Sequence, residues 1–82
     1  MYFVNHPGAI LNEFIERKNI DIKGLSKLTN FTERHISEMI NGTTEISDYF
    51  AFKMSQIFNI PESFWSRIKS EYEEQLKYQQ AV

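Results

Sequence analysis

The chain has 82 residues, which fits one domain rather than several. It is 41% hydrophobic and 15% aromatic and contains no cysteine, so disulfide bonds and thiolate metal sites are excluded. The formal net charge of −2 argues against a general nucleic-acid coat, which needs a strong positive excess, but it allows a binder that concentrates a few cations on one face.

The first predicted helix runs from Pro7 to about Arg17. Proline is favoured at the first helical position because its missing N–H costs nothing there, and we expect Asn5 or His6 to be the N-cap. The spacing of four apolar residues is typical of one buried helical face: Ile10, Leu11, Phe14 and Ile15.

The next segment predicts two short helices joined by a tight turn. One runs from about Ile22 to Thr29 with Asp21 as its cap, and the other runs from about Glu33 to Ile40. Apolar residues three and four positions apart give each helix one face that we expect to be buried: Ile22, Leu25, Leu28, Ile36, Met39 and Ile40.

The turn between these helices has a distinct residue pattern. Asn30 tolerates the left-handed backbone conformation and can therefore end the first helix. Phe31 is apolar, so we expect the turn to pack onto the core. Thr32 is expected to cap the second helix by accepting from the backbone N–H of Arg34 or His35. Residues 22–40 therefore have the pattern of a DNA-binding helix-turn-helix.

Two further helices complete the predicted fold. Ser47 caps a fourth helix that continues to about Phe58, and its wide apolar surface indicates a central place in the core: Phe50, Ala51, Met54, Ile57 and Phe58, with Phe52 on another side. Asn59 ends it, and Pro61 starts a fifth helix to about residue 77, with one apolar face: Phe64, Trp65, Ile68, Tyr72 and Leu76. No segment alternates like a strand. The prediction is an all-α single domain of five helices over residues 1–82.

In a helix-turn-helix, the N-terminal part of the second helix enters the major groove of DNA. Six residues are candidates by position: Thr32, Glu33, Arg34, His35, Ser37 and Glu38. Arg34 is the strongest, because a guanidinium can donate two hydrogen bonds to guanine; its alternative is a solvated arginine paired with Glu38. Glu33 and Glu38 can accept from cytosine, but they also repel phosphates. Four flanking residues are candidates for backbone contacts: Lys23, Lys27, Asn41 and Thr43.

His35 has two interpretations, as a donor to phosphate or base and as a side chain that is exposed or packed against the first helix. We expect no metal site, because the chain has two histidines, no cysteine and no carboxylates spaced to join His6 or His35 as ligands. No phosphate loop, nucleophile elbow or paired-acid signature is present, so we expect no cofactor and no enzyme activity. The start MYFVNHPG does not have the pattern of a signal peptide and no segment approaches ~20 apolar residues, which predicts a cytoplasmic protein without a membrane partner.

The order of several motifs resembles a known family. His6-Pro7-Gly8 precedes the first helix, and Pro61 followed by Phe64-Trp65 begins the last one. Together with the helix-turn-helix, these motifs resemble the HigA/VapI-type antitoxins, a branch of the Xre/Cro/C1 helix-turn-helix family, over roughly residues 6–72. The flanking motifs, rather than the helix-turn-helix, narrow the resemblance to this branch.

The resemblance implies a lambda-repressor-like fold and a homodimer that binds a palindromic operator in double-stranded DNA. It also implies a cognate toxin, a RelE/HigB-like ribonuclease, which the antitoxin neutralises. A two-fold operator requires a dimer surface, for which we favour three residues of the last helix: Ile68, Tyr72 and Leu76. Two alternatives remain. One is a phage-type Cro/C1 regulator without a toxin. The other is a protein-binding module with little DNA affinity, which the carboxylates of Glu33 and Glu38 favour because they repel phosphates.

Overall fold

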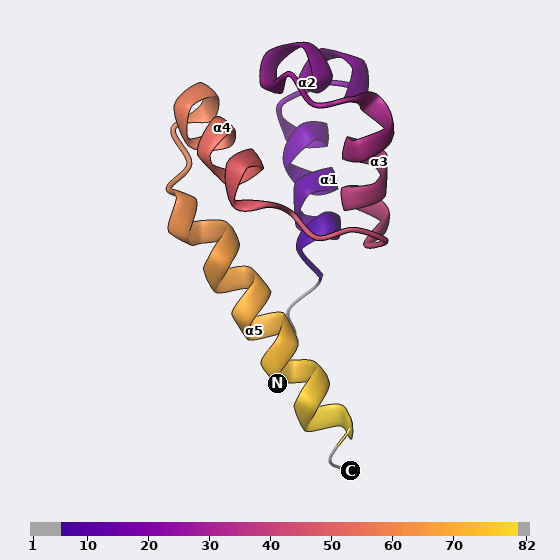
Figure 1. Cartoon of the computed structure of the whole chain (residues 1–82), viewed down its shortest axis with the longest axis vertical. Coiled ribbons are helices and arrows are strands. Elements are labelled where there is room, and N and C mark those ends of the chain that lie inside the picture. The colour runs from indigo at the N-terminus through magenta and orange to yellow at the C-terminus, as the bar shows by residue number, and fades with distance from the viewer. Residues whose placement is uncertain (1–5, 81–82) are drawn as a thin grey trace.

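Five helices follow one another along the chain in the computed structural model, which describes the backbone of residues 6–80 and the side chains to residue 77 (Figure 1). They are α1 (Pro7–Arg17), α2 (Ile22–Thr29), α3 (Glu33–Asn41), α4 (Asp48–Phe58) and α5 (Glu62–Gln80). The all-α prediction is confirmed, and the bounds of α1, α2 and α4 are those expected. Helix α3 continues one residue beyond Ile40, and α5 begins one residue after Pro61 and continues past residue 77.

The helix starts follow from local hydrogen bonds. Asp21, Thr32 and Ser47 each accept from the backbone N–H three residues later, at 2.7, 3.0 and 3.1 Å respectively. These contacts satisfy donors that the first turn of a helix leaves free, and all three predicted caps are confirmed. At the start of α1, His6 is the N-cap residue but makes no side-chain capping bond. The alternative cap, Asn5, lies outside the described residues.

The helix ends follow from left-handed backbone conformations. Asn30 and Asn59, the predicted ends of α2 and α4, have φ angles of 64° and 62°. Gly42 ends α3 with φ 80°. A fourth such residue, Asn19 with φ 57°, lies in the link between α1 and α2 and was not predicted. Asparagine tolerates this region better than most residues because its short side chain bonds locally.

The core draws on all five helices. Six hydrophobic side chains among the described residues are at most 1% exposed: Leu11, Leu25, Ile36, Met39, Phe50 and Met54. Trp65 of α5 belongs to this cluster at 3% exposure, and Ile68 of the same helix is also buried, at 8%. The edge of the Phe14 ring also meets the Phe58 ring, with centroids 5.1 Å apart, which ties α1 to α4. The central place predicted for α4 is therefore confirmed.

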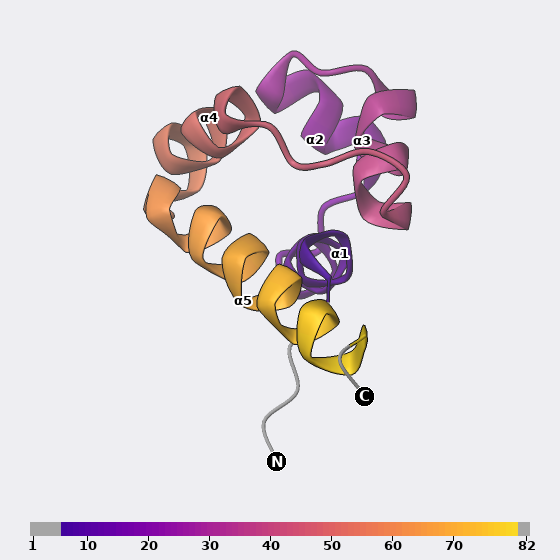
Figure 2. The same ribbon diagram turned by 60° about the horizontal axis from the view of Figure 1, so that its bottom comes forward.

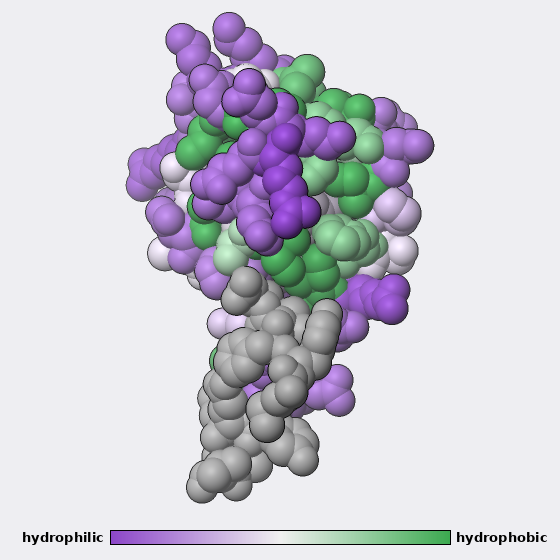
Figure 3. Space-filling view, turned by 180° about the vertical axis from the view of Figure 1, so that it is seen from behind, coloured by the Kyte–Doolittle hydropathy of each residue, from purple (hydrophilic) through white to green (hydrophobic). Residues whose placement is uncertain are grey.

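Three apolar residues that were expected to face the core are exposed instead. Leu28 is 50% exposed. A residue three positions after Leu25 lies about 60° away from it around the helix, whereas a residue four positions later lies closer to the same face. Thr29 therefore occupies the buried position. Phe64 is 40% exposed and sets its ring edge-on against Trp65, while Phe52 is 39% exposed. Figure 3 shows the opposite side of the molecule, where hydrophobic patches lie between hydrophilic side chains over the upper part.

Helix α5 is the long element of the structure. It packs against α4 and α1, and its last turns extend beyond the other four helices (Figures 1 and 2). The molecule accordingly measures 43 × 23 × 22 Å. Among the described residues, no helix is both long and apolar enough to cross a membrane.

The first turn of α1 meets the last turn of α3 at very close range. A Cβ added at Gly8 would lie 2.1 Å from the carbonyl oxygen of Met39 and 2.6 Å from that of Ile40. Both atoms belong to the backbone, so neither can move aside alone. This contact accounts for the glycine of the His6-Pro7-Gly8 motif, and it positions α3 against α1.

Candidate nucleic-acid interface

Helix α3 has one face in the core and one face in solvent. Ile36 and Met39 are buried and hold the helix in place. Thr32, Glu33 and Arg34 are exposed at its start. Three other candidates are half-buried: His35, Ser37 and Glu38. The six predicted residues therefore extend from the N-cap of α3 to its middle, and the exposed ones lie at its start.

The turn before α3 is fixed by hydrogen bonds and ring packing. The hydroxyl of Ser26 donates to the carbonyl oxygen of Phe31, and that of Thr29 donates to the carbonyl oxygen of Leu25 at 2.8 Å. The Phe31 ring meets the Phe50 ring edge-on, with centroids 5.1 Å apart. The expectation that Phe31 packs onto the core is confirmed, whereas the hydrogen bond of Ser26 was missed. These contacts fix the orientation of α3 relative to α2.

Arg34 lies in an ion pair on the surface of α3. Its Nε is 3.6 Å from Oε2 of Glu38, and the two side chains are 88% and 44% exposed. This is the solvated pair that the four-residue spacing predicts. Exposed pairs of this kind contribute about 0.3–0.5 kcal/mol. The guanidinium can therefore leave Glu38 for a base edge at little energetic cost.

His35 packs against the turn. Its ring lies 5.1 Å from the Phe31 ring, centroid to centroid, at an interplanar angle of 50°. Its backbone N–H bonds to the hydroxyl of Thr32. The packed interpretation therefore describes this side chain in the free protein, with the turn as its neighbour rather than the first helix.

Two of the flanking candidates lie at the other end of α3. Asn41 is the last residue of the helix, about 12 Å along the axis from Glu33 at 1.5 Å per residue. Thr43 folds back onto this end, because its backbone N–H and its hydroxyl both donate to the carbonyl oxygen of Glu38, at 3.0 and 3.2 Å. Both residues are exposed. They therefore lie at the C-terminal end of α3, away from Thr32, Glu33 and Arg34 at its start.

The two lysine candidates are exposed on α2. Lys23 lies in its first turn and Lys27 in its last. Lys27 lines a shallow groove between α2 and the end of α1, beside Glu16 and Asp21. Lys27 thus shares this groove with two acidic residues, without an ion pair to either among the described residues. On α3, Arg34 pairs with Glu38 and is adjacent in sequence to Glu33, so two carboxylates lie along the helix with this one guanidinium.

The three residues predicted for dimerisation differ in their accessibility. Ile68 is 8% exposed, so the core takes most of its surface and leaves little for a second subunit. Tyr72 is half-buried, with its ring centroid 6.1 Å from that of His6, and Leu76 is 37% exposed. Accessible surface at this position therefore comes from Tyr72 and Leu76.

Within residues 6–80, no group of three or more His, Asp or Glu side chains is placed to hold a metal ion. The arrangement that stands out chemically is a helix end with exposed donors, held rigidly by the core.

The chain is similar to known proteins in sequence and in structure. The helix-turn-helix family HTH_3 matches residues 11–65. Virulence-associated protein A' of Dichelobacter nodosus is 32% identical over 69 residues, which cover 83% of this chain and 60% of that protein. An uncharacterised HTH-type transcriptional regulator of Escherichia coli K12, YbaQ, is 26% identical over 78% of this chain and 58% of its own length. The chain thus spans about 60% of the length of the curated relatives it matches.

Solved structures share the fold closely. The Pseudomonas aeruginosa antitoxin HigA, solved with the higBA promoter, superposes with a TM-score of 0.82 at 24% identity, covering 95% of this chain and 86% of that chain.

Proposed function

We propose, from the premise that the chain belongs to the helix-turn-helix family HTH_3, that it is a sequence-specific DNA-binding antitoxin. It binds an operator near its own gene through the start of α3 and acts without enzymatic activity in the cytoplasm. Arg34 reads a guanine, and Thr32 meets a phosphate next to it. Asn41 and Thr43 contact the DNA backbone at the far end of α3.

The observation that carries this proposal is the state of Arg34. It is 88% exposed at the start of a helix whose opposite face is anchored by Ile36 and Met39. A bidentate contact between such a side chain and guanine discriminates against other bases by about 1–3 kcal/mol. Support also comes from the likeness to the Pseudomonas aeruginosa antitoxin HigA, whose structure was solved with the higBA promoter.

The proposal extends to two protein partners. A second copy of the chain pairs through Tyr72 and Leu76, so that two α3 helices meet the two halves of a palindromic operator. The cognate toxin is a basic ribonuclease of the RelE/HigB-like type, whose charge complements the net charge of −2 of this chain. Co-expression with the neighbouring small open reading frame tests this part: the toxin is expected to be tolerated only when the antitoxin is present.

Binding to the DNA upstream of the gene tests the core of the proposal. A fluorescence anisotropy titration compares a labelled duplex from this region with a scrambled duplex of equal composition. We expect tighter binding to the natural duplex, and affinity for both that falls as salt rises. Equal affinity for the two duplexes at low salt would contradict sequence-specific binding.

A second candidate function follows from the charges on α3. Glu33 and Glu38 lie beside Arg34, and carboxylates at this position oppose the approach of phosphates. A protein-binding module with little DNA affinity fits this feature. The titration above separates the two functions, because such a module binds neither duplex while it still binds its protein partner.

A further inference from the structure

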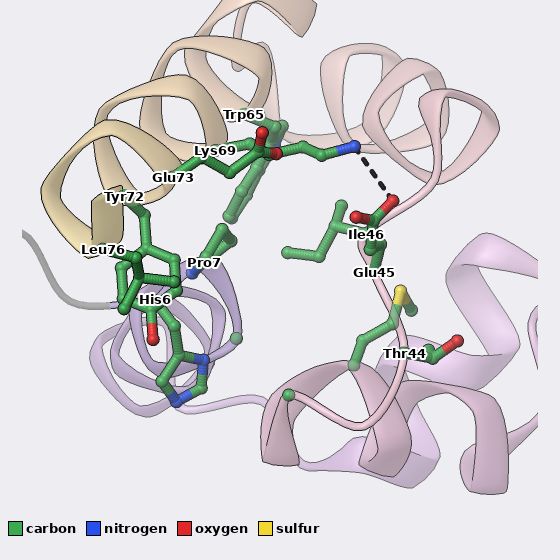
Figure 4. Close-up of a pocket in the computed structure, with 13 residues that line it drawn as sticks. His6, Pro7, Thr44, Glu45, Ile46, Trp65, Lys69, Tyr72, Glu73 and Leu76 are labelled. Carbon is green, nitrogen blue, oxygen red and sulfur yellow. Dashed lines mark hydrogen bonds and ion pairs between the residues drawn. The ribbon is translucent and has the colours of Figure 1, made fainter. Parts of the chain in front are cut away.

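The loop between α3 and α4 is tied to the middle of α5 by an ion pair (Figure 4). The proposed contacts with the DNA backbone lie at the start of this loop, at Asn41 and Thr43. Two residues further on, Oε2 of Glu45 accepts a hydrogen bond of 2.9 Å from Nζ of Lys69, a residue 24 positions later in the chain. The pair spans the rim of a pocket of about 370 Å³ beside Trp65. It therefore links the loop of the proposed DNA contacts to a distant helix.

The hydrogen bonds at the start of the loop converge on one atom. The carbonyl oxygen of Glu38 accepts from the N–H and the hydroxyl of Thr43, at 3.0 and 3.2 Å, and from the N–H of Thr44 at 3.3 Å. A carbonyl oxygen has two lone pairs, so three donors cannot all be aligned with them. These three bonds therefore hold the loop less firmly than three bonds to separate acceptors would, and a further anchor matters for its position.

The pair of Lys69 with Glu45 supplies such an anchor. Its distance of 2.9 Å is that of a well-formed N–H···O bond, whereas the ion pairs within single helices measure 3.6–3.7 Å. The hydrogen bond and the charge of Glu45 raise the pKa of Lys69, so the ammonium form persists at neutral pH. The two side chains are 43% and 75% exposed, so the pair adds little to overall stability. Its consequence is local, because it limits the positions that the loop can take.

We propose that Lys69 is a positioning residue for DNA binding, which acts through Glu45 on the loop that carries Thr43. The inference rests on the proposed DNA-binding function. A loop that is already held in place loses less conformational freedom when it meets a phosphate, and this raises the affinity. Lys69 lies one turn before Tyr72 on α5. The helix that is proposed to pair two copies of the chain thus also sets the position of the loop that meets DNA.

A double-mutant cycle in DNA affinity tests this role, with Lys69→Gln, Glu45→Gln and the variant that carries both changes. Each substitution also removes a charge, but the two charges act on DNA independently, so the cycle cancels their separate effects. Anisotropy titrations with the upstream duplex measure the four affinities at low salt. We expect the double variant to bind at least about twofold more tightly than the product of the two single effects, because each single variant already loses the whole pair.

Amide hydrogen exchange in the free protein tests the position of the loop without DNA. The N–H groups of Thr43 and Thr44 are expected to exchange about twofold faster in Lys69→Gln, because the loop has lost an anchor. Arg67→Gln is the matched control. It also removes a positive charge and an exposed ion pair from α5, but its partner Glu71 lies on the same helix. We expect it to leave both exchange rates unchanged and to weaken DNA binding less than Lys69→Gln does.

The two measurements separate this inference from the function on which it rests. Single effects that multiply without coupling, in a wild type that binds DNA, would overturn the positioning role alone. Exchange at Thr43 and Thr44 that Lys69→Gln does not accelerate would overturn it as well. A wild type that binds neither the natural nor the scrambled duplex would overturn the proposed function and this inference together.

Discussion

Substitution of Gly8 by alanine tests the packing that positions α3. The added Cβ would lie 2.1 and 2.6 Å from two backbone oxygens, whereas real Cβ atoms essentially never approach within 3.0 Å. The start of α1 must therefore move by roughly 1 Å against the end of α3. Overpacking costs about 1–3 kcal/mol, and backbone neighbours favour the upper end. Alanine regains at most about 1 kcal/mol of helix propensity. We expect a net loss of about 2 kcal/mol.

Urea unfolding followed by Trp65 fluorescence measures this loss, and thermal unfolding should show a midpoint lowered by about 8–16 °C. Gly24→Ala is the matched control. Its Cβ would meet side-chain atoms of Asp21 and Ile20 at 3.0 and 3.3 Å, and the gain in helix propensity offsets the small shift of the Asp21 cap, so its stability is expected to stay within about 1 kcal/mol of the wild type. A Gly8→Ala variant within ~0.5 kcal/mol of the wild type would refute the close contact between α1 and α3.

Three further substitutions have defined outcomes. Thr32→Ala removes the acceptor for the His35 N–H and is expected to cost about 1 kcal/mol in urea unfolding, whereas Thr32→Ser should retain most of it. Glu33→Gln removes a carboxylate from the start of α3, the end that we propose contacts DNA, so anisotropy titrations should show tighter binding to natural and scrambled duplexes alike, by roughly threefold at low salt. The hydrogen bond to Glu45 raises the pKa of Lys69. The pair therefore stabilises the fold below the unfolded pKa of about 10.4, and this stabilisation is lost as the pH rises through the folded pKa. Lys69→Gln should therefore be less stable than the wild type near neutral pH, by at most ~0.5 kcal/mol for so exposed a pair, and the difference should vanish at strongly alkaline pH.

Local features of this fold were predictable from the sequence. Caps at Asp21, Thr32 and Ser47 depend on atoms three residues apart, and the ends at Asn30 and Asn59 depend on one residue's backbone preference. Because these determinants are local, the predicted bounds agree with the structure almost throughout. The pair of Arg34 with Glu38 was predictable for the same reason, since spacing along one helix determines it.

Features that depend on the packing of distant segments were not predictable. Leu28 fits an apolar stripe, but the direction from which α3 and α4 approach α2 decides that Thr29 is buried instead. The close contact at Gly8 depends on the end of α3, more than thirty residues later in the sequence. Likewise, the pocket beside Trp65 exists only because α5 passes the start of α1 and the loop after α3.

Some features of the candidate site were likewise predictable from the sequence, and others depend on the packing of distant segments. The sequence pointed to the start of α3 and to Arg34, because motif position and side-chain chemistry suffice for that. It did not reveal that His35 packs on Phe31 or that Ile68 is largely buried in the core. Each of these findings reduces the number of residues available for DNA or a second subunit, and each leaves Arg34 as the principal candidate for base recognition.

The most direct test of the account is therefore the ratio of affinities for the natural and scrambled upstream duplexes, measured for the wild type, Arg34→Ala and Lys27→Ala. Arg34→Ala should keep its fold stability within about 0.5 kcal/mol, because the pair it removes is exposed, and yet lose about 1–3 kcal/mol of discrimination. Lys27→Ala should weaken both duplexes by a similar factor and keep the ratio. If Arg34→Ala retains the full wild-type ratio, base recognition by the start of α3 is contradicted.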